Sequence, residues 1–341
     1  MLLQEAISAV VDGQDLSREQ SAEAMTQLMN GEGTPAQIGG LLVALRMKGE
    51  TVEEITGFAE TMRKMATRVN TSRSPLVDTC GTGGDNSGTF NISTTAAFVV
   101  AGAGLAVAKH GNRSVTSTCG SADVLEALGV SLDLSADDVG RSIDEVGIGF
   151  LFARALHGAM KHVAAPRMEL KIRTVFNLLG PLTNPAGACG QVLGVFDAAR
   201  VPDMAHVLAQ LGTRHAFVVA GADGLDEITL SGPTHVAEAV NGEVKTYEIT
   251  PETLGLEQSQ TEALRGGDAL ANAEILRRVL GGEKGPHRDI VLANSAAALI
   301  AGERAVDWQE AMLVGAESID SGAANSTLDA LIEFTSGAKQ E

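Results

Sequence analysis

The stretch from residue 77 to residue 113 carries the densest set of groups able to bind an anion. It reads VDTCGTGGDNSGTFNISTTAAFVVAGAGLAVAKHGNR, with glycines at positions 81, 83, 84 and 88. Glycine permits positive φ and lets a ligand approach the backbone. Free N–H groups in such a loop, and at the start of the helix expected at 93–102, favour phosphate. The apolar run 105–108 is followed by Lys109, His110, Asn112 and Arg113. The pattern predicts a phosphate cradle beside a cationic strand end.

The loop matches neither of two common phosphate motifs. The chain has no G-x-x-x-x-G-K-[ST], and GTGGD at 81–85 is not G-x-G-x-x-G. A glycine-rich loop alone also fits a tight strand-to-helix turn, so the cationic segment at 109–113 is what favours an anion site. Cys80 beside the loop fits a small buried residue at the end of a strand better than a nucleophile.

A second segment whose side chains could bind a ligand is GADGLDEI at 221–228. It bears three carboxylates and follows the apolar strand FVVA. The side chains of Asp226 and Glu227 would point apart on an extended strand, but they can converge on a turn. Carboxylates next to a phosphate site suit Mg²⁺, which is commonly bound by one or two of them together with substrate phosphates. A solvated acidic turn is the alternative, because the whole chain is acidic.

Composition excludes several classes of function. The 341 residues carry 25 basic and 43 acidic side chains, a net charge of −18, which repels nucleic acid and anionic membranes. One Trp, one Tyr and nine Phe leave few platforms for stacking bases. No apolar run of about 18 residues predicts a membrane span. Three scattered cysteines without a secretory signal indicate the cytoplasm. A phosphorylated substrate would need local positive charge, and the segment 160–173 supplies it with Lys161, Arg167, Lys171 and Arg173.

The elements that must position these groups fall into two regions. The first 70 residues predict four helices, three of them opened by the capping signals Ser17–Gln20, Thr34–Gln37 and Thr51–Glu54. After a polar hinge at 70–75, β-like runs at 76–78, 105–108, 191–195, 215–220 and 289–292 alternate with helical patterns at 122–128, 136–146 and 201–211. This alternation predicts an α/β fold with a mainly parallel sheet, with ligands at the carboxyl ends of the strands. A small antiparallel excursion is expected within 229–262, and closing helices at 266–280 and 295–302.

Six motifs occur in the order of a known family. GTGGD at 81–85, NIST at 91–94, KHGNR at 109–113, GSADVLEALG at 120–129, RTVFNLLGPLTNP at 173–185 and DGLDE at 223–227 resemble anthranilate phosphoribosyltransferase, an enzyme of tryptophan biosynthesis. The resemblance covers essentially the whole chain. It implies a nucleoside phosphorylase/phosphoribosyltransferase-like fold, with a small all-helical domain at 1–70 joined by the helical segment 154–185 to an α/β catalytic domain at 71–153 and 186–341. In the family, the segment 154–185 packs back toward the amino-terminal helices.

The resemblance also implies a reaction. The 5-phosphoribosyl group of phosphoribosyl pyrophosphate (PRPP) would pass to the amine of anthranilate, giving N-(5-phosphoribosyl)anthranilate and pyrophosphate, with Mg²⁺ as cofactor and two ions per subunit. The matching donor positions are Gly81, Gly84, Asp85, Thr89, Asn91, Ser93, Thr94, Lys109, Arg113, Ser117 and Ser121. The matching anthranilate positions are Gly81, His110, Asn112, His157 and Arg167. The metal ligands would be Ser93, Asp226 and Glu227, although Ser93 also suits the N-cap of the following helix. No general base emerges.

The resemblance further implies a homodimer formed through the helical domain, and a glutamine amidotransferase of anthranilate synthase as a partner. Three positions depart from the family pattern: Arg154 and Gly158 stand where proline is usual or frequent, and Lys171 stands where glycine is common. The alternatives are a pyrimidine nucleoside phosphorylase, which shares the GTGGD-like loop, and a non-catalytic relative that binds phosphate or nucleic acid. The acidic pair at 226–227 and the Asn112–Arg167 pair argue against the first, and the net charge argues against the second.

Overall fold

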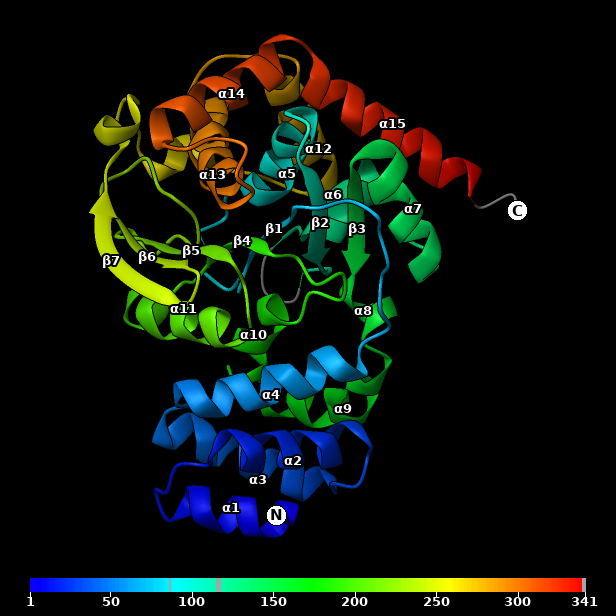
Figure 1. The fold of residues 1–341 in the computed structure, drawn as a ribbon, viewed down its shortest axis with the longest axis vertical. Coiled ribbons are helices and arrows are strands. Elements are labelled where there is room, and N and C mark those ends of the chain that lie inside the picture. Colours follow the sequence, from blue (N-terminus) through cyan, green and yellow to red (C-terminus); the bar gives the residue numbers. More distant parts are fainter. Residues whose placement is uncertain (86, 115–117, 339–341) are drawn as a thin grey trace.

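The computed structural model describes residues 1–341 except 86, 115–117 and 339–341. A layer of helices at the amino terminus lies beneath a larger α/β part (Figure 1). This layer comprises α1 (Leu3–Val11), α2 (Arg18–Met29), α3 (Pro35–Lys48) and α4 (Val52–Met65). The three capping signals are confirmed, because the side chains of Ser17, Thr34 and Thr51 each accept a hydrogen bond from the backbone N–H three residues ahead.

The α/β part is built on a seven-stranded sheet in the order β3-β2-β1-β4-β5-β6-β7. The strands are β1 (Leu76–Gly81), β2 (Ala106–Gly111), β3 (Ile148–Phe152), β4 (Gly190–Gly194), β5 (His215–Gly221), β6 (Thr234–Val240) and β7 (Glu243–Ile249). Neighbours from β3 to β5 are parallel, and β6 and β7 continue the sheet as an antiparallel hairpin. The predicted α/β class, the mainly parallel sheet and the antiparallel excursion are therefore confirmed.

Helices cover both faces of this sheet. They are α5 (Ile92–Gly102), α6 (Ser121–Ala127), α7 (Ala136–Val146), α11 (Val201–Gln210), α12 (Ala269–Leu280), α13 (Pro286–Ala301), α14 (Trp308–Asp320) and α15 (Ala323–Gly337). Alternation along β5 separates the two faces: Phe217 and Val219 pack in one core with α13, whereas Ala216 and Val218 pack in the other with α11.

The sequence prediction was wrong in one strand and incomplete elsewhere. Residues 289–292 lie inside α13, not in a strand. A short apolar run with β-branched residues does not distinguish a strand from a helix that is buried on nearly all sides, and α13 is such a helix. The strand β3 and the carboxy-terminal helices α14 and α15 were not predicted. The sheet edge β3 is short, so it gives a weak periodic signal.

The segment after β3 turns back to the amino-terminal layer. It forms α8 (Ala153–Leu156), α9 (Lys161–Leu170) and α10 (Phe176–Leu179). Helix α9 contacts α2 and α3, and α10 contacts α4, as the family resemblance implies. Figure 1 shows α9 beside the helical layer and α10 between that layer and the sheet.

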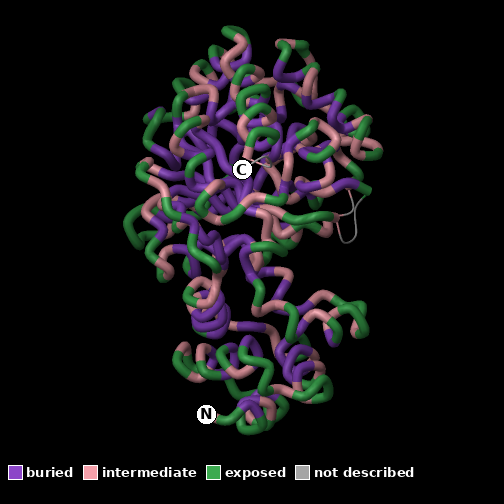
Figure 2. Tube along the Cα trace, turned by 90° about the vertical axis from the view of Figure 1, so that its right-hand side faces the viewer, coloured by how far each residue is buried: buried purple, intermediate pink, exposed green. Residues whose placement is uncertain are grey.

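One apolar core joins the helical layer to the sheet without a break. It extends from Leu3 on α1 through Val163 on α9 and Phe176 on α10 to Met204 on α11 and Val218 on β5. Figure 2 shows buried segments both in the α/β body and among the helices at the lower end. The helical layer therefore packs against α9, α10 and α11, and it shares one core with the face of the sheet on that side.

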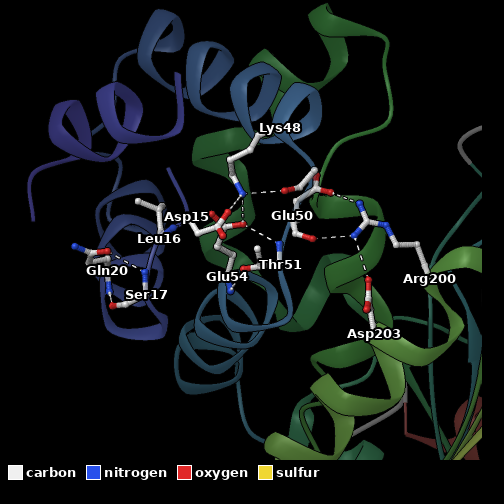
Figure 3. Close-up of polar contacts among 11 residues, drawn as sticks. Asp15, Leu16, Ser17, Gln20, Lys48, Glu50, Thr51, Glu54, Arg200 and Asp203 are labelled. Carbon is white, nitrogen blue, oxygen red and sulfur yellow. Dashed lines mark hydrogen bonds and ion pairs between the residues drawn. The ribbon is translucent and has the colours of Figure 1, made fainter. Parts of the chain in front are cut away.

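Ionic contacts at the turn between α3 and α4 stabilise the helical layer and, through Arg200, connect it to the start of α11 (Figure 3). Lys48 Nζ lies 2.6 Å from Asp15 Oδ1 and 3.0 Å from Glu54 Oε2. The Glu54 carboxylate, which has no solvent exposure, also accepts the backbone N–H groups of Leu16 and Thr51. Two residues after Lys48, the backbone carbonyl and side chain of Glu50 accept hydrogen bonds from Arg200, which immediately precedes α11.

Lys48→Met is expected to lower the free energy of unfolding by about 3 kcal/mol, because it leaves a buried carboxylate without its cation. Urea unfolding followed by circular dichroism measures this. The control is Lys64→Met on α4, where the side chain is exposed. Equal, small losses in both variants would show that the Lys48–Glu54 pair contributes no more than a surface pair.

Candidate active site

The site lies at the carboxyl ends of β1 and β4. These adjacent strands mark the point where the sheet order changes direction, since β2 and β3 follow on one side and β5 on the other. In open α/β sheets, ligands bind in the crevice outside such a switch point. The loop after β1, the end of β2 and the turn after β5 all meet there.

Asp226 and Glu227 tie the glycine loop to the start of α5. Asp226 Oδ2 accepts the N–H of Gly83 at 2.8 Å, and Glu227 Oε1 accepts the N–H of Ser93 at 3.2 Å. A Cβ atom at Gly81 would overlap the Asp226 carboxylate, so glycine here gives room to a protein side chain. The two acids lie together on the turn after β5, as the sequence predicted, and Glu227 meets the third predicted metal residue, Ser93, at the start of α5.

The electrostatics of this acidic pair suit a divalent cation. Burial, and next the charge of Asp85, raise the pKa of Asp226 to about 7. Burial, and next the charge of Asp226, raise the pKa of Glu227 to about 8. A cation bound between these carboxylates would relieve both effects. Across the described residues, no group of three or more His, Cys, Asp or Glu side chains is placed to hold a metal by itself. Two carboxylates completed by substrate phosphates and water fit Mg²⁺.

Ser93 does not cap α5. The residue at the N-cap position is Asn91, and it makes no side-chain capping bond. Ser93 lies one position inside the helix, where its backbone N–H faces Glu227. The N-cap alternative for Ser93 is therefore wrong, and its position beside Glu227 keeps it in the candidate metal site.

A cluster of buried polar side chains holds the carboxyl end of β2 in place. Asp78, with no solvent exposure, accepts the backbone N–H of His110 at 3.0 Å and an N–H of the Asn184 amide at 2.8 Å. Lys109 is also buried and donates to the backbone carbonyl of Thr79. Burial lowers the pKa of Lys109, and the nearby Asp78 carboxylate opposes this shift. The side chain of the predicted donor residue Lys109 is therefore held at the end of β1, just under the loop.

His110 and His157 form a buried pair. Their Nε2 atoms lie 3.2 Å apart and their ring centroids 5.1 Å apart. Burial, and next the neighbouring His157, lower the pKa of His110 to about 3; burial lowers the pKa of His157 to about 4. Both rings are neutral at pH 7, so one can donate to the other. His157 is not on a solvated helix face.

The buried histidine pair is expected to make the stability of the fold sensitive to acid. Because the folded-state pKa values lie below the ordinary value of 6.5, the unfolded chain binds more protons, and stability present above pH 6.5 is lost as the pH falls toward 4. His157→Gln should reduce the slope of unfolding free energy against pH in this range by up to about 1.4 kcal/mol per pH unit. Urea unfolding from pH 7 to pH 4 measures it. The exposed His206→Gln on α11 is the control; identical slopes for both variants would contradict a buried neutral pair.

Arg167, a predicted anthranilate residue, lies on α9. Its guanidinium stands 4.7 Å from the ring centroid of Phe176, and burial lowers its pKa. No carboxylate in the described part of the chain forms an ion pair with it. The surface-charge alternative for Arg167 is therefore wrong. A half-buried guanidinium stacked on an aromatic ring is suited to a planar carboxylate.

The remaining predicted residues are distributed around the loop. Thr94 Oγ1 donates to Ser121 Oγ at 3.0 Å, joining α5 to α6. The Asn91 amide accepts from Asn272 and donates to the Cys119 carbonyl. The Asn112 side chain accepts the N–H of Arg113.

Other predicted donor residues form hydrogen bonds or ion pairs with neighbouring residues of the chain. Thr89 bonds Ser87, whose N–H reaches the Asp85 side chain, and the Gly84 carbonyl accepts from Arg173. Arg113 does not face the loop here: it pairs with Asp123 and Glu126 of α6, at 3.1 and 2.5 Å. Ser117 lies outside the described residues.

Comparison with known proteins identifies the relatives of this arrangement. Residues 4–66 match the helical bundle domain of a glycosyl transferase family, and residues 73–325 match its a/b domain. Anthranilate phosphoribosyltransferases from Symbiobacterium thermophilum and Moorella thermoacetica are 58% and 57% identical, over 96% and 98% of both chains. The crystal structure of anthranilate phosphoribosyltransferase from Thermus thermophilus is 46% identical, covers 97% of this chain and 99% of its own, and has a TM-score of 0.93.

The chain belongs to the anthranilate phosphoribosyltransferase family. A family member from Saccharomyces cerevisiae has been solved in complex with PRPP and Mg; it is 29% identical, with a TM-score of 0.90 and 98% of each chain covered. The same yeast enzyme has been solved in complex with 4-fluoroanthranilate. The resemblance inferred from six motifs is confirmed.

Two residues at the site are not among the predicted site residues. Asn184 sits within the RTVFNLLGPLTNP motif, and its amide bridges the Asp78 carboxylate and the Ala108 carbonyl. Arg173 opens the same motif and reaches Gly84. The sequence signal for both is their place in the family motif at 173–185.

The backbone conformation at Lys171 explains why glycine is common at this position in the family. Lys171 follows the last residue of α9 with φ 50° and ψ 30°, the left-handed conformation that glycine adopts freely. Lys171→Gly is therefore expected to raise the free energy of unfolding by about 1 kcal/mol, measured by thermal and urea unfolding. Lys171→Ala separates backbone from charge, since it should give no such gain. A gain of the same size in both variants would assign the effect to the side chain.

None of the helices in the described part of the chain has the length and apolar composition that crossing a bilayer demands.

Proposed function

We propose that the protein transfers the 5-phosphoribosyl group of PRPP to the amine of anthranilate, releasing pyrophosphate. The observation that carries this function is the meeting, at one switch point of the sheet, of the glycine loop, buried Lys109 and the Asp226–Glu227 pair. Its supporting context is the near full-length identity to anthranilate phosphoribosyltransferases. The enzyme is accordingly a Mg²⁺-dependent glycosyltransferase of tryptophan biosynthesis.

The donor half of the site performs binding and charge neutralisation. PRPP is a polyanion whose C1 gains oxocarbenium character as pyrophosphate leaves, so the protein must hold the reactants in line and stabilise the departing charge. The loop N–H groups, the hydroxyls of Thr94 and Ser121 and the Lys109 ammonium serve this purpose. Asp226, Glu227 and Ser93 would hold Mg²⁺, which, when bound, neutralises charge on the pyrophosphate. The Asp85 carboxylate suits donor hydroxyls or a hydrated metal.

The acceptor half binds a small aromatic acid. Arg167 carries a positive charge with no carboxylate partner in the described chain, and it is the group best suited to the anthranilate carboxylate. Asn112, His110 and His157 would complete this half-site, with His110 and Asn112 at the end of β2 and His157 in contact with His110. Because both rings are uncharged at pH 7, the positive charge for the anthranilate carboxylate would come from Arg167 and not from the histidines. We assign no general base.

Several finer properties belong to this proposal. Two Mg²⁺ ions would bind per subunit, one of them through Asp226 and Glu227. The helical layer at 1–70, joined through 154–185, would act as one domain against the α/β part at 71–153 and 186–341. It would also form a homodimer, supported by the exposed Leu2, Val11 and Met47. Light scattering on the purified protein measures this mass. A cytoplasmic location and a glutamine amidotransferase partner complete the proposal.

The test is the decay of anthranilate fluorescence in the presence of PRPP, first with Mg²⁺ and then with EDTA. Loss of signal only with Mg²⁺ supports the reaction, the acceptor and the cofactor together. Phosphorolysis of thymidine or uridine with no anthranilate turnover would overturn the proposal in favour of a nucleoside phosphorylase.

A further inference from the structure

Arg173 connects the acceptor-side segment to the donor loop. It lies between α9 and α10, and its Nη2 donates to the backbone carbonyl of Gly84. Its guanidinium lies 3.8 Å from the ring centroid of Phe196, just beyond the end of β4. The aromatic ring fixes the plane of the guanidinium, so the hydrogen bond to Gly84 has a defined direction.

The glycine loop is thereby held from two sides by opposite charges. Gly83 donates its N–H to the Asp226 carboxylate, and the next residue, Gly84, accepts from Arg173. Gly83 and Gly84 have φ of 67° and 82°, values that glycine adopts readily, and these two contacts hold the short stretch in place. Removing the cationic contact leaves the acidic one, which holds the loop toward the carboxylates.

The balance of charge around the loop also favours a role for Arg173 in donor binding. The donor brings several negative charges to a site that already contains Asp85, Asp226 and Glu227. Arg113 is engaged by Asp123 and Glu126, whereas Arg173 forms no ion pair within the described chain. Among the hydrogen bonds described, Arg173 is the basic side chain that contacts the loop.

We propose that Arg173 is a positioning residue for the donor, which shapes the glycine loop at Gly84 and supplies positive charge beside the pyrophosphate of PRPP. This inference rests on the proposed function. It assigns to the segment 161–173 two separate tasks, with Arg167 directed to the acceptor and Arg173 to the donor.

The experiment compares Arg173→Ala, Arg173→Lys and Phe196→Leu with the full-length wild-type enzyme. Arg173→Ala should raise the KM for PRPP and weaken inhibition by pyrophosphate by about tenfold to a hundredfold, as for a lost hydrogen bond to a charged group. The KM for anthranilate should stay within twofold. Arg173→Lys should restore part of the loss. Phe196→Leu should weaken donor binding less, and add nothing to Arg173→Ala in the double variant, because the ring acts through the guanidinium.

The exposed Lys161→Ala, on α9 of the same segment, is the control for general loss of positive charge. Binding of pyrophosphate with Mg²⁺, measured by calorimetry, needs no turnover. It therefore tests Arg173 even if the wild type does not convert anthranilate. That outcome would overturn the proposed function alone. Unchanged PRPP KM and pyrophosphate affinity in Arg173→Ala, or an effect confined to anthranilate, would overturn the inference.

Discussion

Replacing Asp226 by Asn and Glu227 by Gln together is expected to lower kcat/KM for PRPP by about 10³-fold. The double variant keeps the shape of the turn and part of its hydrogen bonding to Gly83 and Ser93. It removes both negative charges, and with them the reason for a divalent cation to reside there. The measurement is the initial rate of anthranilate consumption over a range of PRPP and Mg²⁺ concentrations. The Mg²⁺ concentration for half-maximal rate should rise.

Asp223→Asn is the matched control, because this third carboxylate of the turn serves another purpose. Asp223 accepts hydrogen bonds from the hydroxyls of Thr229, Ser231 and Thr261. Its replacement should reduce stability while leaving the Mg²⁺ dependence unchanged. Wild-type turnover and Mg²⁺ dependence in the Asp226→Asn, Glu227→Gln variant would place the metal elsewhere.

Arg167→Ala is expected to raise the KM for anthranilate by about 10²-fold or more and to leave the KM for PRPP near its wild-type value. The substitution removes a charge-assisted, two-pronged contact with a carboxylate. Arg167→Lys should recover little, because an ammonium neither matches the planar carboxylate nor stacks on Phe176 in the same way. Steady-state kinetics with each substrate varied in turn separates the two half-sites. Equal effects on both KM values would remove Arg167 from the acceptor role.

The extent to which sequence predicted the fold depended on how local each signal is. The caps at Ser17, Thr34 and Thr51 determine helix starts through bonds spanning three residues, so those starts were predicted correctly. Residues 289–292 were assigned wrongly because burial on all sides of α13 removes the periodicity that separates helix from strand.

The candidate site follows the same rule. Asp226 and Glu227 are adjacent in the chain and were paired in advance, whereas the contact of Arg173 with Gly84 spans 89 residues and that of Asn184 with Asp78 spans 106. Nothing in the local pattern indicates such partners. Arg113 shows the converse: a basic residue in a donor motif forms ion pairs with its own neighbouring helix.

The unbroken apolar core between α1 and β5 limits how this protein can be recombined. A fragment beginning at β1 would retain α11 but lose the residues of α4 that pack against it. Such a fragment would present an apolar patch to water and is expected to self-associate. Exchanging the amino-terminal helices for those of a relative therefore requires the matching surfaces of α9, α10 and α11 to be carried with them. The two parts match separate family models but share one apolar core.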